Sequence, residues 1–479
     1  ACTCGSFVDK KTSPRCSRRD GDAASMKIKA VARSERTETR QSTAEKMVER
    51  RNLDPQHHPF AQAREYTRAV VAAKLDRMMA KPFVCALDAH ADGITCLAAP
   101  RTGSTVQLVS GAADGEARVW DLAQRKCVWR APAHVGAVRA AVLCPAADAF
   151  LTCGERCVRM WKLEVQGDDD AEPDAQETWT SAFGGINDVD VAWGSRTETA
   201  FATASTEGTV ELWDAARTNP IRKWSWGSDA VLRVRWNPAE PAVLASSGRD
   251  RSLALYDARQ AAPLRKTILT SRANGLAWNP REPGVIVVGC DDGNALTFDV
   301  RKLDKPRMIH TDHVHAILDV AFAPSGLEFA TAGADRTTRI FPARGGGGRS
   351  RESYHAQRMQ RVTCVAFTSD ASFLVTGSDD ANVRVWKAQA SAKLGPVSGR
   401  ERASLEYRAT LLKRHQHMPV VRRIVKQRNL PKMVKKMKER QAEARDRERA
   451  KLNSTIDHSK PGAIQPVAAR AKAVIRELD

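Results

Sequence analysis

The chain has 479 residues, with 76 Lys and Arg against 56 Asp and Glu, and a formal net charge of +20. No apolar run is long enough to span a membrane, so the sequence predicts no membrane partner. The 11 cysteines are scattered and lack the spacing of a zinc site, which indicates reduced, buried thiols in an intracellular protein.

The positive charge is concentrated at the two ends of the chain. Residues 84–387 hold 35 basic and 37 acidic residues, and are close to neutral. Residues 26–83 hold 13 basic and 7 acidic residues, and residues 388–479 hold 23 and 9. Basic ends favour polyanionic partners, nucleic acid first, although simple solvated arms would have the same composition.

The N-terminal segment divides into two predicted parts. Residues 1–25 are expected to be a disordered tag or leader, with Met26 as the natural start. Residues 26–82 form a predicted arm with one helix, from Pro59 to about Met79. One stripe of this helix is only half apolar, so the helix needs a partner surface to be stable. The residues predicted on or near that stripe are Phe60, Ala63, Tyr66, Thr67, Val70, Ala73 and Arg77.

A repeat organises residues 83–387. Seven times, an acidic residue in a turn precedes, by six positions, an aromatic residue that ends a strand, and the copies are 41 to 52 residues apart. This pattern predicts an all-β fold, a seven-bladed WD-repeat β-propeller with a basic N-terminal arm and a basic α-helical C-terminal extension. The aromatic residues are Trp120, Trp161, Trp213, Tyr256, Phe298, Phe341 and Trp386, and the acidic residues are Asp114, Glu155, Glu207, Asp250, Asp292, Asp335 and Asp380.

The first repeat shows what these residues are predicted to do. Strands are expected at 94–98, 106–111 and 117–122, and residues 83–87 form a further strand that completes the last blade and closes the ring. The spacing of His90, Asp114 and Trp120 predicts a hydrogen-bonded network that braces the blade. His134, His313 and His355 open the second, sixth and seventh repeats, whereas the third to fifth lack a clear histidine. These histidines, the acidic turn residues and the aromatic residues are all predicted to have structural roles.

Two irregular segments interrupt the repeats. Residues 166–174 are acidic and predict a solvated loop, although a metal-binding loop is an alternative without an EF-hand pattern. Gly345–Gly348, between the sixth and seventh repeats, lack the context of a phosphate-binding loop and predict a flexible connector.

The C-terminal extension is predicted to be helical. A linker, residues 388–399, leads to a basic helical domain, residues 400–452, with 18 basic and 6 acidic residues. Its prolines divide it into predicted helices at 400–418, 420–428 and 432–452. The last segment, residues 453–479, is predicted to carry a short helix at 468–478.

A dense run of cations marks the candidate RNA- and partner-binding surface. Lys and Arg release counterions when they contact phosphates, and the scarcity of aromatic residues nearby argues for backbone contact instead of base stacking. A charged helix that binds acidic protein or serves nucleolar import is the alternative. The predicted contact residues are Arg422, Arg423, Lys426, Arg428, Lys432, Lys435, Lys436, Lys438, Arg440, Arg64 and Arg68.

No catalytic or cofactor-binding motif is found, so the sequence predicts neither an enzyme nor a bound cofactor or metal. Two adjacent repeats end in Tyr256-Asp257-Ala258-Arg259 and Phe298-Asp299-Val300-Arg301. Both resemble the WDxR box of cullin-4 ubiquitin ligase substrate receptors, with the Trp replaced. Arg259 and Arg301 are therefore candidate contacts for the ligase adaptor, and ordinary blade ends are the alternative.

The two flanks resemble the suppressor-of-fibrillarin family of WD-repeat nucleolar proteins, also described as cullin-4-associated factors. The resemblance covers about residues 26–452. It is carried by Arg51–Pro55, His58–Phe60, Ala63–Ala69, Lys74–Phe83, Glu406–Tyr407, Leu412–Arg414, His417–Pro419, Arg422–Ile424 and Leu430–Lys432. The acidic loop and the glycine run depart from what the family leads us to expect.

The resemblance implies a non-catalytic factor of the small-subunit processome in the nucleolus of the nucleus. Its implied partners are processome proteins, the U3 small nucleolar RNA and 18S pre-rRNA. A substrate receptor of a cullin-4 ligase and a generic WD-repeat scaffold remain the alternatives.

Overall fold

A computed structural model describes residues 57–101, 107–144, 149–163, 177–180, 184–192, 200–226, 229–460 and 468–478. The predicted leader at 1–25 and the acidic loop at 166–174 lie outside these residues. The chain divides into two compact units, residues 1–64 and 65–479, and the propeller and its helices belong to the second. Within the described residues, no helix is long and apolar enough to cross a membrane.

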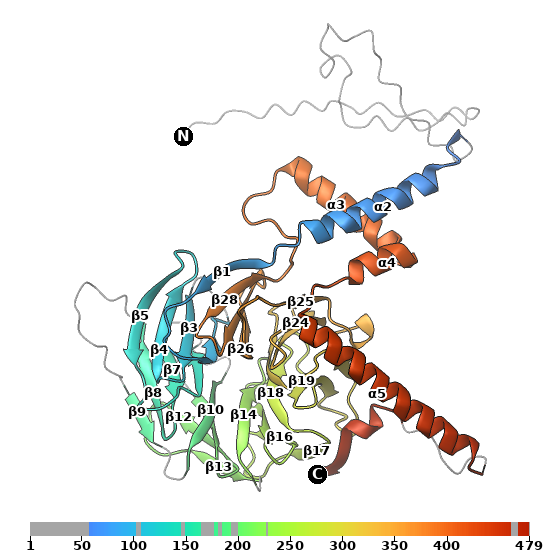
Figure 1. The fold of residues 1–479 in the computed structure, drawn as a ribbon. Helices are drawn as coiled ribbons and strands as arrows, with labels where there is room; N and C mark the ends of the chain where they lie inside the picture. The colour runs from blue at the N-terminus through green and yellow to red at the C-terminus, as the bar shows by residue number, and fades with distance from the viewer. Residues whose placement is uncertain are drawn as a thin grey trace, which may run out of the picture. The chain divides into compact units, whose positions relative to one another are not determined.

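Seven antiparallel sheets follow one another along the chain, so the predicted seven-bladed propeller is confirmed (Figure 1). In each of the first six blades, the four strands pair in chain order. Blade one holds β2 (Ile94–Ala98), β3 (Gln107–Ala112), β4 (Glu116–Asp121) and β5 (Lys126–Pro132). Blade two holds β6 (Ala140–Leu143), β7 (Ala149–Cys153), β8 (Cys157–Lys162) and β9 (Glu177–Thr180). Blade three holds β10 (Ile186–Val191), β11 (Ala200–Ser205), β12 (Thr209–Asp214) and β13 (Arg222–Ser225).

The remaining blades repeat the arrangement. Blade four holds β14 (Val231–Trp236), β15 (Val243–Gly248), β16 (Ser252–Asp257) and β17 (Arg265–Leu269). Blade five holds β18 (Ala273–Trp278), β19 (Val285–Cys290), β20 (Asn294–Asp299) and β21 (Met308–Thr311). Blade six holds β22 (Ile317–Phe322), β23 (Glu328–Gly333), β24 (Thr338–Pro342) and β25 (Glu352–Tyr354). Blade seven holds β26 (Val362–Phe367), β27 (Phe373–Ser378) and β28 (Val383–Lys387).

The ring closes as predicted. Strand β1 (Phe83–Leu87) comes first in the chain but pairs antiparallel with β28, and so supplies the fourth strand of blade seven. The ring of Phe83 meets that of Trp386 edge-on, with centroids 5.5 Å apart. Pairing the first strand with the last blade leaves no open edge between the ends of the array.

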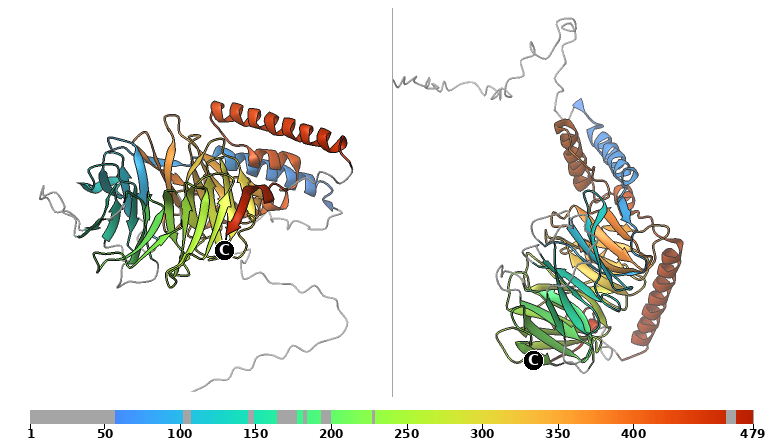
Figure 2. Two further views of the ribbon diagram at one scale, coloured as in Figure 1. Left: turned by 90° about the horizontal axis from the view of Figure 1, so that it is seen from below. Right: turned by 90° about the vertical axis from the view of Figure 1, so that its left-hand side faces the viewer.

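Helix α2 (Ala61–Met78) forms where the sequence predicts it, and it has the partner surface that it needs. Ala69 and Ala73 are fully buried against Leu411 of α3 and Val421 of α4. The views of Figures 1 and 2 agree that α2 and α3 lie side by side. Part of the predicted stripe is wrong, because Phe60, Ala63 and Thr67 are exposed.

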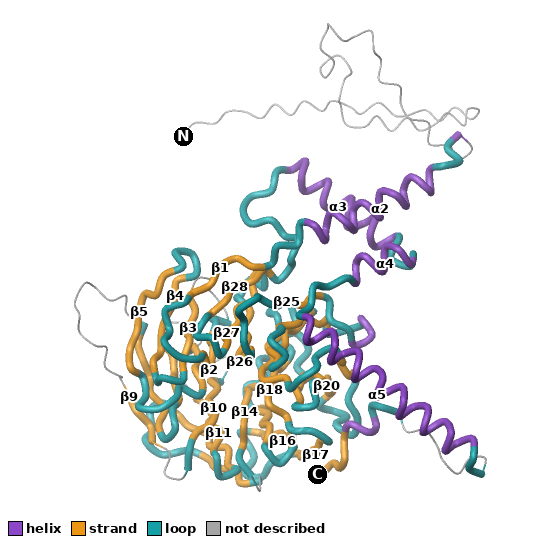
Figure 3. The backbone as a smooth tube through the Cα atoms, viewed as in Figure 1, coloured by secondary structure: helices purple, strands orange, loops and turns teal. Residues whose placement is uncertain are grey.

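The C-terminal extension contains three helices, α3 (Gly399–Arg414), α4 (Pro419–Lys426) and α5 (Lys432–Asp457). In Figure 3 these helices and α2 lie outside the ring of strands. Ser398 caps α3 through its hydroxyl, and Pro419 occupies the first turn of α4. The prolines therefore divide the segment as predicted, since proline is tolerated only in the first turn of a helix.

The helix predicted at 468–478 is wrong. A single turn at Ala471–Ala473 leads into strand β29 (Val474–Leu478), which pairs with β17 and gives blade four a fifth strand. Alanine-rich sequence favours a helix locally, but the outer edge of β17 offers backbone groups that need partners. The β-branched Val474 and Ile475 suit a strand, and tertiary pairing decides.

The glycine run is packed at one end only. It lies inside blade six, between β24 and β25, where Gly346–Gly348 form a tight turn against β21. Gly348 is buried with φ +73°, and a Cβ there would stand 2.2 Å from the Ile309 carbonyl oxygen. Only glycine fits this position, so the run is packed at Gly348, whereas Gly345 to Gly347 are exposed and their flexibility stays a prediction.

Candidate nucleic-acid interface

Helix α4 has one apolar and one basic face. Val421 is fully buried, and Ile424 and Val425 pack against the same cluster as Ala69 and Ala73. The other face carries three exposed cations, Arg422, Arg423 and Lys426. Apolar contact with α2 therefore fixes a helix whose outer surface is positive.

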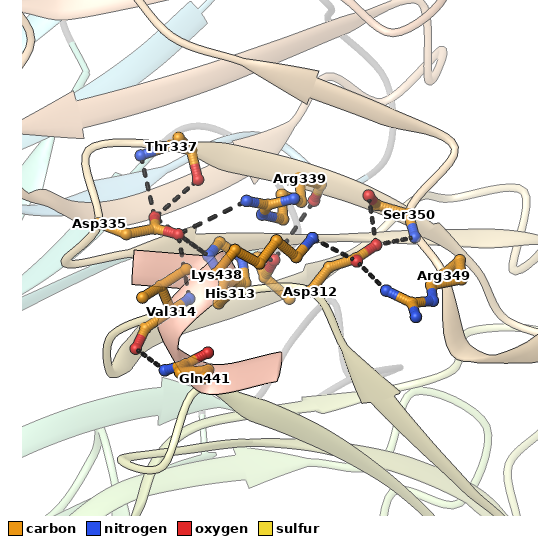
Figure 4. A network of polar contacts seen from close by, with 11 residues as sticks. Asp312, His313, Val314, Asp335, Thr337, Arg339, Arg349, Ser350, Lys438 and Gln441 are labelled. Carbon is orange, nitrogen blue, oxygen red and sulfur yellow. Dashed lines mark hydrogen bonds and ion pairs between the residues drawn. The ribbon is translucent and has the colours of Figure 1, made fainter. Parts of the chain in front are cut away.

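Helix α5 is attached to the propeller at the connection between blades five and six (Figure 4). Lys438 Nζ donates to Asp312 Oδ1 at 2.8 Å, and Gln441 Nε2 donates to the Val314 carbonyl oxygen at 3.1 Å. Asp312 also accepts from Arg349 Nη1 at 3.0 Å and from the Ser350 backbone N at 2.6 Å. A single carboxylate thus holds α5 and the glycine-containing loop of blade six together.

The charge of Asp312 is stabilised by these partners. Burial by itself raises the pKa of this carboxyl, but Lys438 and Ser350 outweigh burial and hold the pKa well below its usual range. The side chain is only 7% exposed. Asp312 is therefore ionised at neutral pH, and it neutralises cations that would otherwise face one another.

The attachment site adjoins a buried network in blade six. His313 Nε2 lies 2.6 Å from Thr331 Oγ1, and its Nδ1 lies 3.1 Å from Asp335. Asp335 also accepts from Thr337 Oγ1 at 2.6 Å, and Arg339 Nη2 lies 3.7 Å from it (Figure 4). Because every member of this network is buried, α5 is attached beside a densely hydrogen-bonded part of the blade.

A second attachment involves Arg428. Its Nε lies 3.3 Å from Glu352 Oε2, its guanidinium donates to the Arg351 carbonyl, and Arg77 of α2 contacts the same Glu352 at 3.1 Å. Burial lowers the pKa of Arg428, against the attraction of Glu352. Two residues of the predicted RNA-binding run, Arg428 and Lys438, are thus internal anchors in this structure.

The other seven cations of the run behave differently. All are exposed, and within the part of the chain that the structure describes none forms an ion pair or a side-chain hydrogen bond. They are Arg422, Arg423, Lys426, Lys432, Lys435, Lys436 and Arg440. Arg68 is also exposed, with Nη1 3.5 Å from the Tyr407 hydroxyl, and Arg64 is an exposed residue of the first unit. Their contact with RNA stays a prediction.

A groove of about 1060 Å³ lies between blade six and helices α3 to α5. Eight cations and one acid, Asp312, line it; the cations are Arg339, Arg349, Arg351, Lys413, Arg422, Lys426, Arg428 and Lys438. The sequence prediction missed four of these, Arg339, Arg349, Arg351 and Lys413. Arg339 lies on β24, Arg349 and Arg351 lie in the loop before β25, and Lys413 lies on α3, so no single run of charge in the sequence could reveal them.

Arg259 and Arg301 lie in the turns that follow β16 and β20, the third strands of blades four and five. In each turn the preceding aspartate carboxylate accepts the arginine backbone N–H, at 2.9 Å from Asp257 and 3.1 Å from Asp299. Both side chains are exposed. Since successive antiparallel strands reverse direction, these turns open on the propeller face opposite to the connection that holds Asp312 and Val314.

The acidic turn residues do not all work alike. Asp114, Asp250, Asp292 and Asp335 each accept the backbone N–H two residues later, at 2.9 to 3.1 Å. Asp380 pairs with Arg384 and Glu155 pairs with Arg139, and neither Glu155 nor Glu207 accepts the N–H two residues later among the described contacts. An aspartate can reach its own turn in this way, and the longer glutamate is less suited to it.

The bracing network of blade one is centred on a residue that the sequence prediction did not name. Ser110 Oγ lies 2.6 Å from His90 Nε2 and accepts from Trp120 Nε1 at 2.7 Å. Thr152, Thr203 and Thr376 accept from the corresponding tryptophans at 2.8 to 3.0 Å. Asp114 belongs to the turn, and its carboxylate makes no hydrogen bond to His90 among the described contacts.

Comparison with known proteins agrees with this architecture. Residues 388–474 match the Sof1-like domain, and residues 81–121, 305–341 and 349–387 match the WD domain, G-beta repeat. Proteins named DDB1- and CUL4-associated factor 13 are similar along most of their length. The one from Homo sapiens is 43% identical over 94% of this chain and 99% of its own length. The one from Danio rerio is 41% identical over 95% and 100%, and the one from Dictyostelium discoideum is 37% identical over 86% and 91%.

A chain that joins WD repeats to a Sof1-like domain, and that aligns with these relatives almost end to end, is a WD-repeat scaffold of their kind. It belongs to the suppressor-of-fibrillarin (Sof1) family, which includes the proteins named DDB1- and CUL4-associated factor 13.

Proposed function

We propose that this chain is a non-catalytic assembly factor of the small-subunit processome, located in the nucleolus of the nucleus. In this role the propeller binds neighbouring processome proteins, and the basic helices contact the U3 small nucleolar RNA or 18S pre-rRNA. The observation that carries the proposal is the set of seven exposed cations, unpaired among the described residues, on two helices held by contacts to α2 and α3 and to the propeller. Because the backbone of these helices is already ordered, binding to a phosphate backbone costs only the freedom of the side chains, which counterion release can offset.

Co-purification of U3 RNA with the tagged full-length chain tests this role. One variant replaces the seven exposed cations of α4 and α5 with Gln. The matched control replaces seven exposed cations of the propeller, Arg125, Lys126, Arg130, Arg156, Arg217, Arg249 and Arg251. We expect loss of U3 RNA from the first variant alone. Absence of U3 and pre-ribosomal RNA from the unmodified protein at moderate salt would contradict the proposal.

The cellular location provides a second test. A tagged protein enriched in the nucleolus is expected for an assembly factor, whereas a generic scaffold would be distributed without this preference. Nuclease treatment separates the two further, because a scaffold whose tail binds acidic proteins would keep its partners after RNA is digested.

A substrate receptor of a cullin-4 ubiquitin ligase is the second candidate function. Two observations favour it: Arg259 and Arg301 are exposed in equivalent turns of adjacent blades, and the relatives carry the name DDB1- and CUL4-associated factor. Changing both arginines to Ala should abolish binding of purified DDB1 and leave RNA association intact. Arg217→Ala, after the third strand of blade three, is the control. Unchanged DDB1 binding by the double variant would refute this candidate.

Both roles are compatible in one molecule. The basic helices contact the connection into blade six, while Arg259 and Arg301 lie in turns on the opposite face. A partner on one face therefore leaves the other face free.

A further inference from the structure

The groove between blade six and the helices is lined by eight cations, of which five pair with acids of the propeller and three do not. Eight of its residues are Lys or Arg, and its one acid, Asp312, is already occupied by Lys438, Arg349 and Ser350. Three of the cations, Lys413, Arg422 and Lys426, are exposed and have no acidic partner among the described residues. A concave surface of one sign focuses its field on an approaching ligand of the opposite charge.

A buried arginine in the same lining is incompletely satisfied. Arg339 is 2% exposed, and its Nε and Nη2 have no hydrogen-bond partner. Its nearest acid, Asp335, stands 3.7 Å away and already bonds His313 and Thr337. A buried guanidinium with unused N–H groups is unfavourable, and an anion that entered the groove would supply acceptors.

We propose that this groove binds the sugar-phosphate backbone of RNA, with Lys413, Arg422 and Lys426 on neighbouring phosphates and Arg339 as the deepest anion contact. This inference rests on the RNA-binding role proposed above and names the surface that performs it. Arg422 and Lys426 are four residues apart on α4, a rise of about 6 Å on the same helix face. Lys413 reaches the groove from the last turn of α3.

The ligand is a polymer backbone rather than a base or a single phosphorylated side chain. Within the described residues the lining contains no Phe, Tyr or Trp, and His417 is its one aromatic ring, so it offers little surface on which successive bases could stack. Exposed cations continue beyond the groove at Arg423, Lys432, Lys435 and Lys436. A surface of this length suits a ligand that carries one charge per repeating unit.

The experiment measures binding of the purified full-length chain to a fluorescein-labelled 20-base-pair RNA duplex, by fluorescence anisotropy at several KCl concentrations. The groove variant combines Lys413→Glu, Arg422→Glu and Lys426→Glu. Its matched control combines Arg445→Glu, Arg449→Glu and Lys451→Glu, which are exposed on the far half of α5 and change the net charge equally. We expect the groove variant to bind at least tenfold more weakly than the control, with a shallower dependence of log K on log[KCl].

Arg339→Lys tests the deepest contact, because it keeps the charge and removes the planar set of N–H groups. We expect a severalfold loss of duplex affinity. The unfolding midpoint of the variant is measured as well, to show whether it is still folded. Arg422→Gln, at an exposed position, serves as a second variant that does not strain the fold. Equal losses in the groove and control triple variants would overturn the proposal. Displacement of the duplex by a phosphoserine peptide of equal total charge, at lower concentration than unlabelled duplex, would assign the groove to phosphopeptides instead.

The outcome is separable from that of the proposed function. If the groove variant binds the duplex like the control but the unmodified protein still co-purifies with U3 RNA, only the groove assignment fails. If the unmodified protein retains no U3 RNA, the processome role fails whatever the duplex measurement shows.

Discussion

The attachment of α5 through Asp312 gives the sharpest test of how the extension is held. Asp312→Ala removes the acceptor of the Ser350 backbone N–H, and an unsatisfied buried donor costs about 1–3 kcal/mol. The cations lose less, because Lys438 and Arg349 are 33% and 62% exposed and such pairs contribute about 0.2–1 kcal/mol each. Together these terms predict that the free energy of unfolding falls by roughly 1.4–5 kcal/mol.

Urea denaturation of the full-length chain measures this loss, and amide exchange in α5 reports whether the helix is released. Asp304→Ala is the control, since that side chain is 55% exposed at the other end of β21, in the turn between β20 and β21, and should cost under about 0.5 kcal/mol. A double-mutant cycle with Lys438→Met should give a coupling of about 0.5–1 kcal/mol. Zero coupling, with unchanged exchange in α5, would refute the reasoning.

The stabilisation that Asp312 provides should depend on pH. Its pKa in the folded chain lies below the ordinary value of about 3.9 in the unfolded chain, so the folded state binds the proton less readily. The stabilisation is therefore complete well above pH 3.9 and is lost as the pH falls below it. The stability difference between the unmodified protein and Asp312→Ala should be constant from pH 6 to 8 and should shrink between pH 5 and 3.

Three further predictions concern the fold. Gly348→Ala should destabilise blade six by more than about 2 kcal/mol, because the new Cβ collides with the Ile309 carbonyl oxygen. Gly347→Ala is the control: it has open space around it and should cost only about 1 kcal/mol for its positive φ. Equal thermal shifts of the two variants would contradict the packing at Gly348. Deletion of residues 468–479 should raise amide exchange in β17, while β16 stays protected. Ser110→Ala should lower the unfolding free energy by about 1–3 kcal/mol, because it leaves two buried nitrogens without their shared partner; an effect under about 0.5 kcal/mol in urea denaturation would show that this bridge is unimportant.

Much of the propeller can be predicted because its information is local and repeated. In each repeat, an acidic turn residue and an aromatic residue six positions later indicate where the third strand begins and ends. The seven copies of this pattern indicate seven blades. The pairing of residues 83–87 with the last blade also follows, since an array of blades is stable only when its ends meet. Prolines place the breaks between helices for an equally local reason.

Other features depend on residues that are distant in the sequence. Residues 474–478 form a strand because β17 offers an unpaired edge, which outweighs the helical preference of the alanines before them. The run of cations looks uniform in the sequence, yet Lys438 and Arg428 are bound by Asp312 and Glu352 of the propeller. Charge alone cannot distinguish an anchor from a free cation, because the difference lies in whether a buried carboxylate stands opposite.

The sequence by itself thus determined the propeller, its number of blades, its closure and the basic character of both ends. The tertiary structure decided which cations are free, and it brought Arg339, Lys413 and Arg422 into one groove. The physical reason is that turns and strand patterns are set by neighbours along the chain, whereas a field of one sign depends on which side chains packing brings together.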